Sequence, residues 1–98
     1  MQQYVILRRG AWHSPADLEA AAARSTEVAD TQMDDQVRWI RSYVLDEPGG
    51  DVGTVCIYEA TGPEAIRRHG AFADLAVDEI IAISGTVVVR PDPQTAAA

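Results

Sequence analysis

The sequence contains no lysine. All eight of its basic residues are arginines, against fifteen acidic residues, and the net charge is −7. The absence of lysine beside abundant alanine and arginine is typical of a GC-rich genome and indicates no particular chemistry. The acidic balance argues against general binding to a nucleic-acid backbone, which requires a basic face. We expect a protein that repels nucleic acid and attracts cations.

Cysteine is nearly absent as well. Cys56 is the single cysteine, so no internal disulfide can form and a disulfide-stapled secreted scaffold is excluded. The start of the chain, MQQYVILRRG, has no long apolar stretch behind a basic segment, and no apolar run approaches the ~20 residues of a membrane-spanning helix. We expect a cytoplasmic protein without a membrane partner.

The length is that of one domain, since the chain has 98 residues. A chain of this size buries roughly two thirds of its unfolded surface, which allows a modest core. The sequence predicts a single domain over residues 1–90. Residues 91–98, which are rich in proline and alanine, are predicted to form a flexible tail.

The centre of the chain predicts a β-hairpin followed by a helix. Two short runs rich in β-branched and aromatic residues, 37–45 and 54–60, flank a loop with a Pro-Gly-Gly sequence, which is typical of antiparallel strands. Thr61 and Glu64 have the spacing of a capping box, and Pro63 suits the first turn of a helix. The segment therefore reads as strand, turn, strand and capped helix.

The flanking segments complete the pattern. Residues 4–7 are a short apolar run that predicts a strand, and Ser14 with Pro15 predicts the start of a helix that ends near residue 30. Residues 80–83 predict another strand, and residues 86–90 predict either its continuation or a short extra C-terminal strand. The order β-α-β-β-α-β indicates an α+β, ferredoxin-like fold with an antiparallel sheet.

The two central strands also predict the oligomeric state. In neither strand is one alternating set of side chains wholly polar. A sheet with helices on one face and water on the other should alternate cleanly between apolar and polar residues. Because two helices can cover only one face, we expect another copy of the chain to cover the other face, in a homodimer with barrel-like packing.

Two candidate metal ligands lie in this central region. His69 is on the apolar side of the second helix and is either a buried structural histidine or a metal ligand or acid/base group. Cys56 is either a small buried hydrophobic residue or a functional group, as a soft metal ligand or a nucleophile. If Val55 and Ile57 face the helices, Cys56 points away from His69, and the two cannot bind one metal within a subunit.

His13 is the third candidate. It lies beside the start of the first helix and is either a solvated loop histidine or, with Asp17, part of a surface metal site. No spacing such as HxxxH or CxxC accompanies it, so no preformed metal cage is expected.

A mixed set of aromatic and polar side chains is expected to share the face opposite the helices. This set is either the core of the dimer interface or a pocket for a small anionic or phenolic molecule. The second alternative implies a small-molecule-binding protein or, by analogy of fold, a small enzyme of secondary metabolism. The residues are Trp39, Arg41, Tyr43, Cys56 and Tyr58.

Four groups of residues look like the motifs of a known family. They are Val37, Trp39, Ser42, Tyr43 and Val44; Cys56, Tyr58, Glu59 and Ala60; Glu64, Ala65, Ile66, Arg67 and His69; and Val77, Asp78, Glu79 and Ile80. Together they resemble a family of small bacterial nickel-binding proteins of ferredoxin-like fold, formerly catalogued as a domain of unknown function. The resemblance covers roughly residues 3–83, and Arg8 and Arg9 stand where some members carry histidines.

The resemblance implies a homodimer that binds divalent nickel and serves in its sequestration or sensing. The candidate ligands remain those weighed above on their own chemistry, namely His13, His69 and Cys56, and nickel is the one cofactor that the resemblance implies. The alternative is the small-molecule pocket described above.

Overall fold

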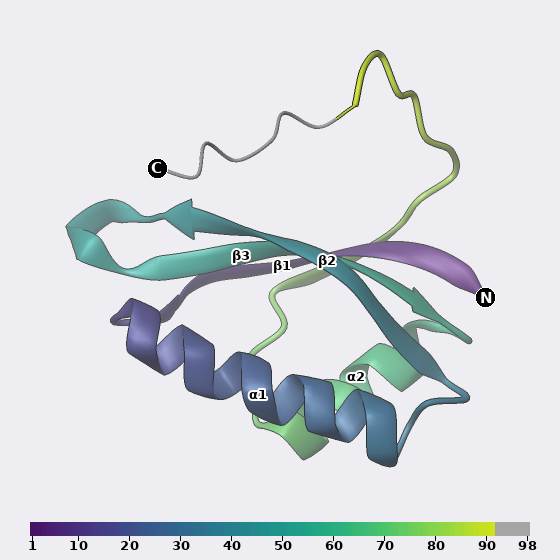
Figure 1. The fold of residues 1–98 in the computed structure, drawn as a ribbon, viewed down its shortest axis with the longest axis horizontal. Coiled ribbons are helices and arrows are strands. Elements are labelled where there is room, and N and C mark those ends of the chain that lie inside the picture. Colours follow the sequence, from purple (N-terminus) through teal and green to yellow (C-terminus); the bar gives the residue numbers. More distant parts are fainter. Residues whose placement is uncertain (92–98) are drawn as a thin grey trace.

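The computed structural model describes residues 1–91, in which two helices pack on one face of a four-stranded antiparallel sheet (Figure 1). The elements are β1 (Gln2–Trp12), α1 (Pro15–Thr31), β2 (Val37–Asp46), the 3₁₀ helix η1 (Pro48–Gly50), β3 (Val52–Ala60), α2 (Pro63–Ala73) and β4 (Glu79–Ala82). The strand order is β2-β3-β1-β4. The predicted ferredoxin-like α+β fold is confirmed.

The predicted hairpin is formed by β2 and β3, which pair antiparallel across η1. β1 lies between β3 and β4 and is longer than the predicted strand. Its pairing with β3 is regular as far as Arg8, shifts, and resumes at Trp12 opposite Val52. Gly10 lies inside this irregularity with φ of 53°, a conformation that glycine adopts without steric cost. The irregularity carries the strand on to Trp12.

The two helices begin differently. Ser14 caps α1, as predicted, because its Oγ accepts a hydrogen bond from the Asp17 amide at 3.2 Å. The predicted capping box at Thr61 is wrong: the cap of α2 is Gly62, without a side-chain hydrogen bond. Since Pro63 occupies the first helical position, Glu64 falls one position too early to complete such a box.

The face of the sheet under the helices carries the core. Tyr4 and Ile6 of β1 and Cys56 and Tyr58 of β3 are buried there, against Ile66 of α2. The strand β3 thus has the parity opposite to the one considered from the sequence. The polar atoms of Cys56 and Tyr58 find hydrogen-bond partners on this face, which is what burial of such groups requires.

The opposite side of the sheet, called the open face below, has a partly exposed apolar centre. The residues of this centre alternate with the buried ones, are half-buried or exposed, and stand opposite one another in the strand pairs. They are Val5, Leu7, Val55, Ile57 and Ile81. Polar residues on the same face flank them, including Gln3, Glu59 and Glu79.

The predicted extra strand at residues 86–90 is not formed. These residues follow β4 without regular structure, and Val87, Val88 and Val89 are 91%, 75% and 80% exposed. Figure 1 shows this stretch leaving the sheet on the side opposite the helices, away from the four strands formed by the described residues. In residues 1–91 no helix is long and apolar enough to cross a membrane. Except for Pro91, the predicted tail lies outside the described residues.

Candidate functional site

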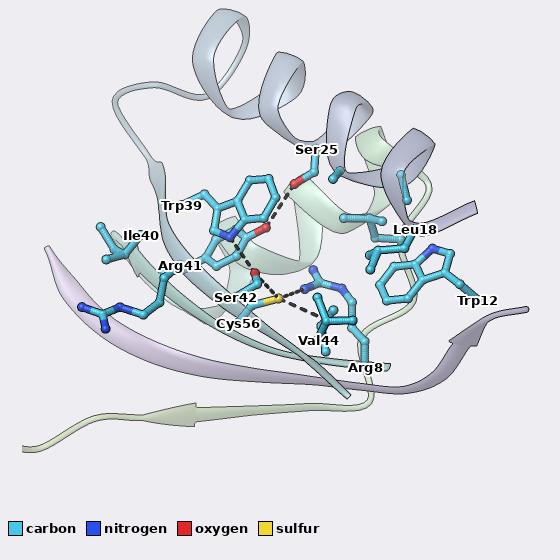
Figure 2. A pocket seen from close by; sticks show the side chains of 15 residues that line it. Arg8, Trp12, Leu18, Ser25, Trp39, Ile40, Arg41, Ser42, Val44 and Cys56 are labelled. Carbon is cyan, nitrogen blue, oxygen red and sulfur yellow. Dashed lines mark hydrogen bonds between the residues drawn. The ribbon is translucent and has the colours of Figure 1, made fainter. Parts of the chain in front are cut away.

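A cavity of about 420 Å³ lies between α1 and the helix-covered face of the sheet (Figure 2). It is open to solvent on one side, and residues from β1, α1, β2 and β3 form its walls. Both tryptophans of the chain are among them. The lining residues are Arg8, Trp12, Leu18, Ala21, Ala22, Ser25, Trp39, Ile40, Arg41, Ser42, Val44, Thr54, Cys56, Tyr58 and Leu75.

A β-bulge in β2 builds one wall of this cavity. Trp39 pairs with Tyr58 and Arg41 pairs with Ile57, so Ile40 is an extra residue without a partner in β3. The extra residue reverses the alternation. Trp39 and Ser42 therefore face the helices together, and the Trp39 Nε1–H donates to the Ser42 hydroxyl at 2.8 Å.

This hydrogen bond is the first of a chain that reaches β3 (Figure 2). The Ser42 hydroxyl donates to Cys56 Sγ at 3.0 Å, and Sγ also lies 3.3 Å from the Thr54 hydroxyl. Arg8 Nη1 donates to the same sulfur at 3.2 Å. Cys56 is 4% exposed, so the sulfur is the centre of a buried polar cluster.

Arg8 is the least expected residue of the site. It is 1% exposed, although arginine is rarely buried without a charged partner. Its Nε donates to the Ala76 carbonyl at 2.8 Å, and the guanidinium carbon lies 5.8 Å from the centre of the Tyr58 ring. Its Nη2 is buried and has no hydrogen-bond partner in the described part of the chain.

A second buried polar cluster joins the two helices to β3. The Tyr58 hydroxyl lies 3.1 Å from the Ser25 hydroxyl, and His69 Nε2 donates to the Ser25 carbonyl at 3.0 Å. Burial lowers the pKa of His69, and the charge of Arg8 lowers it further. Burial likewise raises the pKa of Tyr58. Both groups are therefore held neutral at physiological pH.

The three predicted metal ligands lie in three different places. His69 is fully buried in the helix interface, and Cys56 is buried in the sulfur cluster. The His13 side chain is 88% exposed, and its Nδ1 lies 3.1 Å from an Asp51 carboxylate oxygen. Among residues 1–91 no group of three or more histidine, cysteine, aspartate or glutamate residues is placed to hold a metal ion.

The five predicted pocket residues are divided between the two faces of the sheet. Trp39, Cys56 and Tyr58 lie under the helices, whereas Arg41 and Tyr43 stand opposite Ile57 and Val55 on the open face. There the Arg41 guanidinium donates to the Tyr43 hydroxyl at 3.3 Å. The expectation of one shared face is wrong because the bulge at Ile40 reverses the alternation between them.

Known proteins resemble this chain in sequence and in fold. The family described as "Nickel responsive protein SCO4226-like" matches residues 4–83 of the chain. The crystal structure of SCO4226 from Streptomyces coelicolor A3(2) is similar, with a TM-score of 0.68 and 20% sequence identity over 87% of this chain and 99% of that one. At that identity the likeness establishes the fold. No curated protein sequence matches the chain significantly.

Proposed function

Because the chain belongs to the family of nickel-responsive proteins similar to SCO4226, we propose that it is a cytoplasmic homodimer that binds nickel and senses or sequesters it. The family match over residues 4–83 is the observation that carries this proposal. The net charge of −7 supports it, since an acidic surface concentrates divalent cations.

His13 is the residue that fits a nickel ligand. Its imidazole is exposed, and Asp51 holds Nδ1, which leaves Nε2 as the metal-binding atom. Metal-binding histidines commonly donate their other ring N–H to a carboxylate in this way, which fixes the tautomer and the ring orientation. The hydrogen bond to Asp51 raises the pKa of His13, so nickel must compete with a proton there.

His69 and Cys56 fit a nickel site less well. His69 is fully buried, and its Nε2–H is used by the Ser25 carbonyl. Cys56 Sγ already has three polar neighbours. In our proposal the His13 of one protomer is a nickel ligand. Water and acidic groups, including those of a second copy, supply the remaining ligands that nickel needs.

The open face supports the homodimer. Half-buried aliphatic side chains on adjacent strands form a continuous apolar surface there, and Tyr43 at its border is 48% exposed. Monomeric proteins seldom leave such a surface in water. A second copy packed sheet against sheet would cover it, as the mixed patterns of β2 and β3 predict.

The ligand assignment is tested by titrating nickel into tag-free protein, with His13→Gln, Asp51→Asn and His69→Gln as variants. We expect His13→Gln to abolish the high-affinity site and Asp51→Asn to weaken it roughly 10- to 100-fold, the usual effect of removing a carboxylate behind a ligating histidine. His69→Gln should bind nickel like the original protein. Unchanged affinity in His13→Gln would contradict the assignment.

A further inference from the structure

The charge of the cavity wall differs from that of the whole protein. The chain has fifteen acidic residues, yet no aspartate or glutamate is among the described residues that line the cavity. Arg8 supplies a buried positive charge there, and the Arg41 side chain points away from the cavity in Figure 2. The cavity is therefore a positive site inside an acidic protein.

Within residues 1–91, no carboxylate pairs with the buried charge of Arg8. The partners of its guanidinium there are the Ala76 carbonyl and the Cys56 sulfur, with the Tyr58 ring beside them. Burial of an arginine without an opposite charge is costly, because a carbonyl and a sulfur replace only part of the lost hydration. Nη2 is buried and finds no hydrogen-bond partner in this part of the chain.

The rest of the wall suits an apolar, flat molecule. The indole rings of Trp12 and Trp39 and the aliphatic side chains of Leu18 and Val44 surround the space. The hydroxyl of Ser42 adds a polar group to this wall and accepts a hydrogen bond from the Trp39 indole. A volume of about 420 Å³ lies within the usual range for small-molecule sites, which combine apolar walls with a few polar groups.

We propose that this cavity binds a small organic carboxylate with a flat apolar body, and that the carboxylate pairs with Arg8. The guanidinium offers the planar N–H pair that matches a carboxylate, and the aromatic walls take the body of the ligand. Because Nη2 is covered by neighbouring side chains, binding includes a small rotation of the guanidinium toward the cavity. The site is separate from His13 and independent of nickel.

The two tryptophans make this proposal directly measurable. Benzoate, phenylacetate and 3-phenylpropionate are titrated into the full chain while the two indole N–H signals are followed by NMR. We expect at least one acid to shift both signals saturably. Its neutral amide should bind at least about tenfold more weakly, as expected when one charged hydrogen-bonded pair is lost.

Two variants test separately the contributions of the Arg8 charge and of the cavity volume to binding. Arg8→Met should weaken binding of the acid roughly 10- to 100-fold and leave the amide unchanged, whereas the exposed Arg67→Met serves as the matched control and should bind normally. Ala22→Phe keeps Arg8 but fills the cavity from α1, so it should abolish binding even if Arg8→Met fails to fold.

Three results would overturn the proposal. The first is the absence of a saturable shift with all three acids up to about 10 mM, where a ligand with Kd of about 1 mM would nearly saturate the site. The second is equal affinity for an acid and its amide. The third is equal affinity of the original protein and Ala22→Phe for the acid.

Discussion

Deleting Ile40 should leave the fold intact, because this residue is the extra one in the β2 bulge. Without it, Trp39 still pairs with Tyr58 and Arg41 with Ile57, now in a regular ladder. Ile40 is 45% exposed, so its loss removes about half of the 1.5–3 kcal/mol that burial of an isoleucine contributes, or about 1 kcal/mol. The melting temperature should fall by about 4–8 °C.

Deleting Val44 is the matched control, because it shortens β2 by the same length but leaves Ile40 in place. To keep Leu45 opposite Gly53, the strand must turn Arg41 toward Cys56 and Ser42 toward the open face. The hydrogen bonds of Ser42 to Trp39 and Cys56 are then lost, and a second arginine is buried. We expect a loss above about 3 kcal/mol.

The assay is thermal unfolding followed by circular dichroism and tryptophan fluorescence. A loss above about 3 kcal/mol corresponds to a fall of more than about 12 °C for a domain of this size. If deletion of Ile40 lowers the melting temperature as much as deletion of Val44, the bulge is not a simple one-residue insertion and the account of β2 is wrong.

Three further predictions concern other parts of the fold. A Cβ at Gly53 would lie 2.7 Å from the Arg8 carbonyl oxygen, whereas no atom of residues 1–91 lies within 4 Å of one at Gly85. Gly53→Ala should therefore cost about 1–3 kcal/mol in chemical denaturation, and Gly85→Ala should be nearly neutral. Burial lowers the pKa of His69, so the unfolded chain binds the proton more readily and stability should fall as pH drops below the ordinary histidine pKa of about 6.5. Between pH values of about 7.5 and 5.5 the fall in stability should be smaller in His69→Gln than in His13→Gln. An equal fall in the two variants would contradict the assignment of this pH dependence to His69. Truncation at Pro91 should leave the melting temperature unchanged, and a drop of many degrees would show that the removed residues support the fold.

The order of elements could be predicted from sequence because each depends on local signals. The short β-branched runs, the Pro-Gly-Gly turn and the Ser14 cap act within a few residues, and the structure has a strand, turn or helix at each of them. The N-cap of α2 is harder to predict, because Thr61 and Gly62 both precede Pro63 and either could cap the helix. With Pro63 at the first helical position, the cap is the residue before it, Gly62.

The faces of the central strands could not be predicted in the same way. A β-bulge leaves no signal in a strand whose two alternating sets both mix apolar and polar residues. The sequence therefore predicts one face for Trp39 and Arg41, whereas the extra residue Ile40 puts them on opposite faces. In β3 both parities contain apolar residues. The choice between them depends on hydrogen bonds from distant elements, such as that between Ser25 and Tyr58.

The cavity was missed because its key residue belongs to a type expected at the surface. Arg8 was expected to end the first strand, whereas β1 continues to Trp12 and buries it. One signal was available: Tyr4, Ile6 and Arg8 alternate on one face of a strand, and the first two are clearly core residues. The metal-ligand predictions remain to be tested by nickel binding.

The most direct measurement is native mass spectrometry of the tag-free protein with and without added nickel. We expect a dimer that takes up nickel at a fixed stoichiometry and loses this uptake in His13→Gln. A monomer, or a dimer whose mass does not change when nickel is added, would contradict the proposed nickel-binding homodimer.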